Sequence, residues 1–137
     1  MTSTRQQIIS ALATLLHTVP GVVTVAHWRK SPFKLADLPA VYIEAPEDRI
    51  ASVVIGLHDH TLTLVLGLYL PRASAGAVVD DYLDGIMAAI GSNPTLGGLV
   101  NITRPRLITT DLLQTGDIIA AAAVVLEMEY RTAVWQL

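Results

Sequence analysis

Residues 58–70 read HDHTLTLVLGLYL. Leucine occupies every second position from 62 to 70, so the five leucines lie on one face of an extended chain. This period of two predicts a β-strand with one buried side, and Pro71 ends it. Such a face needs helices or a second sheet to cover it.

Two amphipathic helices are predicted, one before and one after this strand. Apolar residues recur at helical spacing over positions 8–19, and Ser3 and Gln6 have the spacing of a capping box at the start. A second apolar stripe covers positions 78–90, with aspartates on the opposite side of the helix. Each helix therefore offers one apolar face to a core.

Four other segments have strand-like composition: 22–28, 39–45, 101–109 and 118–132. Residues 47–57 are ambiguous, and we expect a loop there that could include a strand at 51–55. The segment with Pro105 must bend or lie at a sheet edge. We therefore expect an α+β fold, in which two main helices pack on one face of a mostly antiparallel sheet of four to six strands, within a single domain spanning residues 1–137.

The second helix is followed by residues 91–100, GSNPTLGGLV. A glycine-rich loop can cradle phosphate, but such a loop follows a strand, precedes a helix and usually carries a lysine. Here the order is reversed and no lysine is near. We favour a structural corner, in which Gly91 ends the helix and Gly97 and Gly98 reverse the backbone.

The composition limits the classes of function. Hydrophobic residues make up 52% of the 137, the net charge is −3, and the nine Lys and Arg residues are scattered. Sequence-specific nucleic-acid binding needs clustered cations and is disfavoured. Cysteine is absent, which excludes disulfides and thiolate metal sites. The longest apolar run is too short for a membrane helix and the N-terminus does not resemble a signal peptide, so we expect a cytoplasmic protein without a membrane partner.

His58 and His60 invite a metal hypothesis. On a strand both point to one face, as two zinc ligands would, while Asp59 points the other way. No third ligand is evident nearby, and the polar start of a strand explains the pattern better. We predict no metal, no cofactor and no catalytic residue.

Residues 118–126, IIAAAAVVL, are apolar on both faces of the predicted strand. Either a loop of the same subunit covers the second face, with 47–57 as the candidate, or another subunit does, and both alternatives remain open. We assign one face outward because it is apolar in its middle and charged at its end, as a contact patch with a polar rim would be. Its interface candidates are Ala121, Ala123, Glu127, Glu129 and Arg131.

The loop at 29–38 supplies a second group of interface candidates. It is cationic and contains a phenylalanine that no regular element is expected to bury. Such a loop is suited to ordering against an acidic partner surface. The candidates are Arg29, Lys30, Phe33 and Lys34.

Several features follow one another in a recognisable order: an amphipathic helix ending at VPGV, a loop before LPAVYI, a helix with Tyr82 and Leu83 in its stripe, the NPTLGGLV corner, and a last strand closing with LEMEYRTAVW. This order resembles the tail terminator proteins of long-tailed phages, the family of the lambda-type minor tail protein U. The likeness extends over nearly the whole chain, and none of its motifs is a catalytic signature.

The resemblance implies a structural protein of the virion tail, assembled in the bacterial host cytoplasm, and not an enzyme. Its subunits would form a hexameric ring on the end of the tail tube, stop polymerisation of the tube protein and offer a surface to the head–tail connector protein. Two alternatives are a tail completion or head–tail joining protein, which shares the ring, and a small α+β enzyme or ligand-binding domain, which needs a pocket with convergent polar groups.

Overall fold

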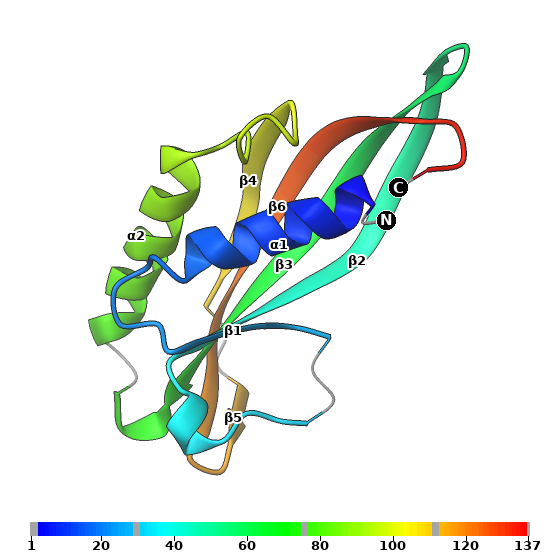
Figure 1. The fold of residues 1–137 in the computed structure, drawn as a ribbon. Coiled ribbons are helices and arrows are strands. Elements are labelled where there is room, and N and C mark those ends of the chain that lie inside the picture. Colours follow the sequence, from blue (N-terminus) through cyan, green and yellow to red (C-terminus); the bar gives the residue numbers. More distant parts are fainter. Residues whose placement is uncertain (1–2, 29–30, 75–76, 111–112, 137) are drawn as a thin grey trace.

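The structure is a computed structural model that describes residues 3–28, 31–74, 77–110 and 113–136. Within these ranges it contains two α-helices and a six-stranded sheet, which confirms the α+β class (Figure 1). The elements are α1 (Thr4–Leu16), β1 (Thr24–His27), η1 (Leu35–Asp37), β2 (Ala40–Val54), β3 (Leu57–Pro71), η2 (Arg72–Ser74), α2 (Ala77–Ser92), β4 (Ile102–Thr109), β5 (Leu113–Thr115) and β6 (Ile118–Ala133).

The strands follow the order β1-β2-β3-β6-β4, and β5 also pairs with β6. β1 runs parallel to β2, whereas the other pairs are antiparallel. The sheet is therefore mixed, and the prediction of a mostly antiparallel sheet is corrected. Parallel neighbours require a long crossover connection, and residues 28–39 between β1 and β2 provide one.

The prediction of a loop at 47–57 is wrong over most of its length. β2 passes the expected stop at Pro46 through a register shift between Glu44 and Glu47, and then pairs with β3 as far as Val54. A bulge of this kind lets a strand accommodate a proline without ending. The end of this hairpin and the end of β6 project from the helices as a distal arm, consisting of residues 47–54, 57–63 and 127–133 (Figure 1).

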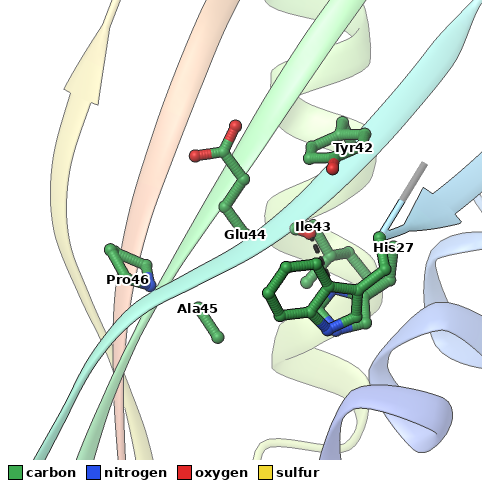
Figure 2. A pocket seen from close by; sticks show the side chains of 7 residues that line it. His27, Tyr42, Ile43, Glu44, Ala45 and Pro46 are labelled. Atoms are coloured by element: carbon green, nitrogen blue, oxygen red, sulfur yellow. Dashed lines mark hydrogen bonds between the residues drawn. The ribbon is translucent and has the colours of Figure 1, made fainter. Parts of the chain in front are cut away.

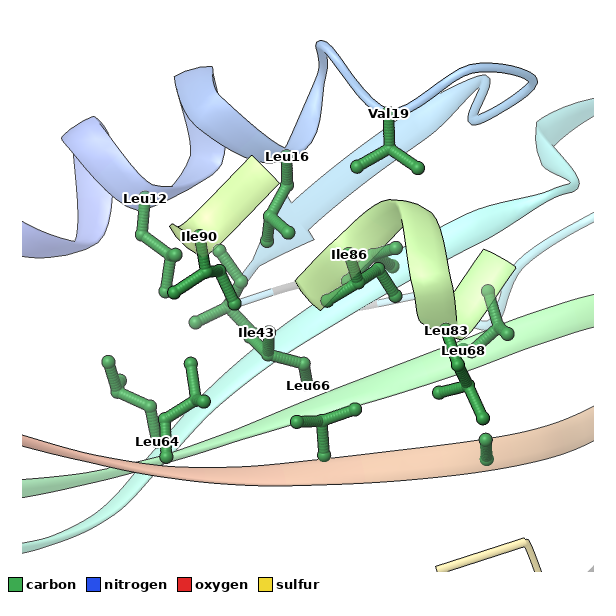
Figure 3. Close-up of a cluster of buried hydrophobic side chains, with 14 of the residues drawn as sticks. Leu12, Leu16, Val19, Ile43, Leu64, Leu66, Leu68, Leu83, Ile86 and Ile90 are labelled. Carbon is green, nitrogen blue, oxygen red and sulfur yellow. The ribbon is translucent and has the colours of Figure 1, made fainter. Parts of the chain in front are cut away.

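The alternating leucines of β3 are buried, as their spacing predicts. They form one core with apolar residues of both helices and of β2 and β6 (Figure 3). We call this side of the sheet the buried face. Besides the leucines of β3, this face includes Val41 and Ile43 of β2 and Val124, Leu126 and Met128 of β6. The helices contribute Ile8, Leu12 and Leu16 of α1 and Leu83, Ile86 and Ile90 of α2 to the same core.

Local signals account for the element boundaries. The predicted capping box is present, because the Ser3 side chain accepts from the Gln6 backbone and the Gln6 side chain accepts in return. α2 continues through Gly91, its predicted end, to Ser92, and the chain then turns at Gly97 and Gly98, whose φ angles of 71° and 95° favour glycine. Leu96 is buried in this turn, so the 91–100 segment anchors the corner between α2 and β4. Among the described residues, no helix is long and apolar enough to cross a membrane.

Candidate functional site

The predicted outward face of β6 is interrupted by a bulge. Leu68 pairs with Ala122 and Tyr69 pairs with Ala120, so Ala121 is an extra residue without a partner on β3. Ala121 is 0% exposed, whereas Ala123 is partly exposed. The extra residue shifts the alternation of the two faces by one position, so odd-numbered side chains before the bulge point into the core. The assignment of Ala121 to the outward face is therefore wrong.

Beyond the bulge the outward assignment agrees with the burial pattern. Ala123, Glu127 and Glu129 are partly exposed and Arg131 is exposed, beside the half-exposed residues at odd positions of β3. We call this side of the sheet the open face. Its small side chains line a hollow of about 170 Å³, bordered by Tyr69 and by Glu44 of β2. The alanines thus leave space on the open face that a larger partner group could occupy.

The charged end of the open face is paired within the subunit. Arg106 lies 2.9 Å from Glu127, and Arg104 lies 2.6 Å from Glu129 across the β4–β6 pair. Arg131 donates to the Asp59 carboxylate at 2.6 and 3.2 Å. The Arg131 hydrogen bond lowers the pKa of the Asp59 carboxyl. These predicted rim residues form a cross-strand ladder of ion pairs, which sequence spacing did not reveal.

Phe33 has a packing partner, contrary to the expectation that no regular element buries it. Its ring centroid lies 5.2 Å from that of Tyr69 and 6.2 Å from that of Tyr42, on the open face. Tyr69 also lies over Gly67, where an added Cβ would be 3.1 Å from the ring. The loop between β1 and β2 therefore crosses the open face, held by an aromatic cluster.

The other loop candidates are less informative. Lys34 is exposed, and its backbone N–H donates to the Asp37 carboxylate at 2.8 Å, which caps η1. Arg29 and Lys30 lie outside the described residues. A role of these cations in binding an acidic partner therefore stays a prediction.

The buried face of the distal arm contains a polar cluster that the sequence did not indicate. His60 Nδ1 lies 3.0 Å from Asp48 Oδ1, and His60 Nε2 lies 2.8 Å from Thr132 Oγ1. The Tyr130 hydroxyl donates to Asp48 Oδ2 at 2.6 Å, and its ring stacks on the imidazole at 4.4 Å. Burial raises the pKa of Tyr130, and its hydrogen bond to Asp48 acts in the same direction. Four polar side chains from three strands thus satisfy one another inside the arm.

The contacts from Asp48 through His60 to the Thr132 hydroxyl resemble the Asp-His-Ser triad of a hydrolase. Here the Thr132 side chain is buried, and its hydroxyl donates to the Gln136 carbonyl oxygen at 3.1 Å. A nucleophile needs access to a substrate and oxyanion donors beside it, which a hydroxyl committed to the backbone does not have. We infer that the cluster positions strands.

The two histidines considered as metal ligands have separate surroundings. His60 is buried against Asp48 and Thr132, whereas His58 is half-exposed and its ring lies 6.5 Å from that of Trp135. Among the described residues no group of three or more His, Asp or Glu side chains could hold a metal ion.

A pocket of about 250 Å³ lies against β2 just beyond the end of β1 (Figure 2). It is smaller than the roughly 300–1,000 Å³ of typical small-molecule sites. The His27 imidazole donates through Nδ1 to the Ile43 carbonyl oxygen at 2.9 Å, and Trp28 and Tyr42 supply aromatic surface. This arrangement suits contact with a side chain of a partner better than catalysis.

Large exposed apolar side chains gather at three places. Val23 and Trp28 flank β1, and Leu35 follows in the β1–β2 connection; Ile102, Leu107 and Ile108 lie on β4; Ile50, Ile55 and Trp135 lie on or beside the distal arm. The first two groups are at opposite edges of the sheet, because β1 and β4 end the strand order. Exposed apolar groups at strand edges are typical of protein interfaces.

Comparison of the chain with protein-family models finds no match, and comparison with curated proteins finds none either.

Proposed function

We propose that this protein is a phage tail terminator, a structural component of the virion tail that forms a ring on the end of the tail tube. The ring would stop addition of tube protein and present a surface to the head–tail connector protein. The order of sequence features supports this proposal, and so do the exposed apolar surfaces that the described residues form.

The observation that carries the proposal is the pair of apolar sheet edges. Leu107 on β4 is 58% exposed, and Trp28 beside β1 is 80% exposed, at opposite ends of the strand order. A surface that binds a different surface of the next copy makes a head-to-tail contact, which generates a ring when the rotation closes. We infer that the β4 edge of one copy meets the β1 edge of the next.

The open face is the second surface that this function would use. We infer that α1 and α2 both cover the buried face, which leaves the hollow beside Ala123 accessible. In a ring, that face would be available to a neighbouring copy or to the tube. Its ion pairs, such as Arg104 with Glu129, would form a polar border around the apolar centre.

Blocking one edge at a time tests the head-to-tail contact. Leu107→Glu places a charge on the apolar surface of the β4 edge, and Trp28→Glu does the same at the β1 edge. Each variant alone should therefore be monomeric by size-exclusion chromatography with light scattering. An equimolar mixture should give dimers, since one intact contact remains. Ile55→Glu, at a still more exposed position beside the distal arm, should keep the ring. A monomeric unaltered protein, or rings in both edge variants, would contradict the contact.

Electron microscopy of particles lacking the protein tests the function itself. Overlong tails are expected for a terminator. Tails of normal length that fail to join heads would identify a head–tail joining protein instead.

A further inference from the structure

The hydrogen bonds of the buried cluster in the distal arm require one more donated proton than a neutral His60 can supply. Asp48 accepts from the Tyr130 hydroxyl at one oxygen, and His60 Nδ1 lies 3.0 Å from the other, so with an ionised Asp48 the Nδ1 nitrogen is a donor. The Gln136 carbonyl oxygen can only accept, so the Thr132 hydroxyl must donate to it. That hydroxyl can then only accept from His60 Nε2, 2.8 Å away.

With Asp48 ionised, all of these contacts coexist only when both ring nitrogens of His60 carry a proton. If His60 loses the Nε2 proton, that nitrogen becomes an acceptor, and the Thr132 hydroxyl has a single proton for two acceptors. Donating to His60 leaves the Gln136 carbonyl without its partner. Donating to Gln136 leaves two lone pairs facing each other at 2.8 Å. A neutral imidazole therefore favours release of Gln136.

We infer that His60 is a proton-dependent latch that holds the C-terminal turn of residues 133–136 through Thr132. The imidazolium binds Asp48 and Thr132 together and leaves the threonine proton for Gln136, and loss of one proton opens the link to the turn. The charged and titratable groups around His60 are Asp48 from β2, Tyr130 from β6, His58 from β3, and Arg5 of α1 beside Tyr130, with the paired Asp59 and Arg131 on the opposite face. Of these groups, Asp48 contacts the imidazole directly, at 3.0 Å.

The turn that this latch controls is weakly held otherwise. Trp135 has a φ angle of 63°, a left-handed conformation that costs a non-glycine residue energy. Besides the Thr132 contact, Gln136 N–H donates to the Ala133 carbonyl at 3.2 Å and Val134 N–H donates to the Gly56 carbonyl at 3.3 Å. The turn presents Trp135, 93% exposed, beside the end of the hairpin with Ile55, 101% exposed. The latch therefore sets the shape of an apolar surface at the tip of the arm. This inference does not depend on the proposed ring.

Fluorine NMR of the intact chain can test the latch. Trp28→Phe leaves Trp135 as the single tryptophan for 5-fluorotryptophan labelling, and His58→Gln removes the other imidazole near its ring. In this background the Trp135 resonance should shift in one step with pH, together with loss of the His60 proton. The same step should appear in the ring nitrogen shifts of His60.

Two substitutions at Thr132 separate the latch from a general pH effect. Thr132→Val keeps the shape without the hydroxyl and should remove the Trp135 step, with the resonance at its high-pH position throughout. Thr132→Ser restores the hydroxyl and should restore the step. A Trp135 step that persists in Thr132→Val, a Trp135 resonance that ignores His60 titration, or a His60 that does not titrate in the folded protein would each overturn the inference. A failed ring assay would leave this result unaffected.

Discussion

Asp59 and His60 are neighbours on β3, yet they belong to opposite faces of the sheet. Asp59 pairs with Arg131 on the open face, where both side chains are well exposed, whereas His60 pairs with Asp48 inside the distal arm. Water screens the first pair, and the second has exchanged water for fixed partners. Burial, and not the presence of an ion pair, therefore decides which of the two the fold depends on.

The two faces should differ most in how much stability the protein loses when arginine replaces an alanine at the bulge of β6. Ala121→Arg forces an unpaired charge into the core and should cost about 3 kcal/mol or more of the free energy of unfolding. Ala123→Arg places the same side chain on the open face and should leave the melting temperature near that of the unaltered chain. Thermal unfolding followed by circular dichroism measures both. Equal destabilisation would mean that Ala123 is covered within the subunit.

Removing one partner of the buried pair should have the next largest effect. Asp48→Ala leaves the buried His60 and Tyr130 side chains without their acceptor, and each buried donor left unsatisfied costs about 1–3 kcal/mol. Asp59→Ala on the open face is the matched control and should change stability far less. Urea unfolding gives the two values. If Asp59→Ala lowers the free energy of unfolding as much as Asp48→Ala does, burial does not determine which pair the fold depends on.

A smaller loss is expected in the aromatic cluster that covers part of the open face. Phe33→Ala removes the ring that contacts Tyr42 and Tyr69 and should cost about 1–2 kcal/mol. Leu35→Ala in the same loop, where the side chain is exposed, should be close to neutral. Urea unfolding tests the pair, and a neutral Phe33→Ala would show that the loop is not held by this contact. Weakened ring or tube binding by Phe33→Ala stays a separate prediction.

The smallest effect is the pH dependence of the exposed pair. Arg131 holds the pKa of Asp59 below the ordinary aspartate value of 3.8, so the pair stabilises the fold above that pH and loses this contribution as the pH falls through the folded-state pKa. Asp59→Asn should therefore converge with the unaltered chain in acid and differ slightly at neutral pH. Melting temperatures from pH 7 downward measure this. A difference that grows in acid would contradict the sign.

Periodic apolar positions made most of the fold predictable. The leucines of β3, the stripes of both helices and the capping box at Ser3 each depend on neighbours within a few residues, and such local signals can be read from one sequence. The edge position of the strand with Pro105 followed from the missing N–H of proline, and β4 is at the sheet edge with a register shift after Pro105.

The misses have physical reasons. Four consecutive alanines show no preference for either face, so the bulge at Ala121 left no trace in the sequence pattern. Pro46 and the charged residues after it resemble a loop, although their backbone pairs with β3. The polar cluster joins Asp48 to residues 12 and 82 positions away, His60 and Tyr130, and such distant partners follow from strand register alone. The single local hint was that His60 shares a face with Leu62.

The extra residue in β6 also determines where this strand tolerates a change of length. Without Ala121, Ala120 and Ala122 would be consecutive opposite Tyr69 and Leu68, and the ladder would be regular. Every remaining side chain would keep its face. Loss of Val125 would instead shift half of the strand by one position and turn leucine and methionine toward water. Insertions and deletions among relatives of this chain should therefore concentrate at the alanine run and be absent from the rest of β6.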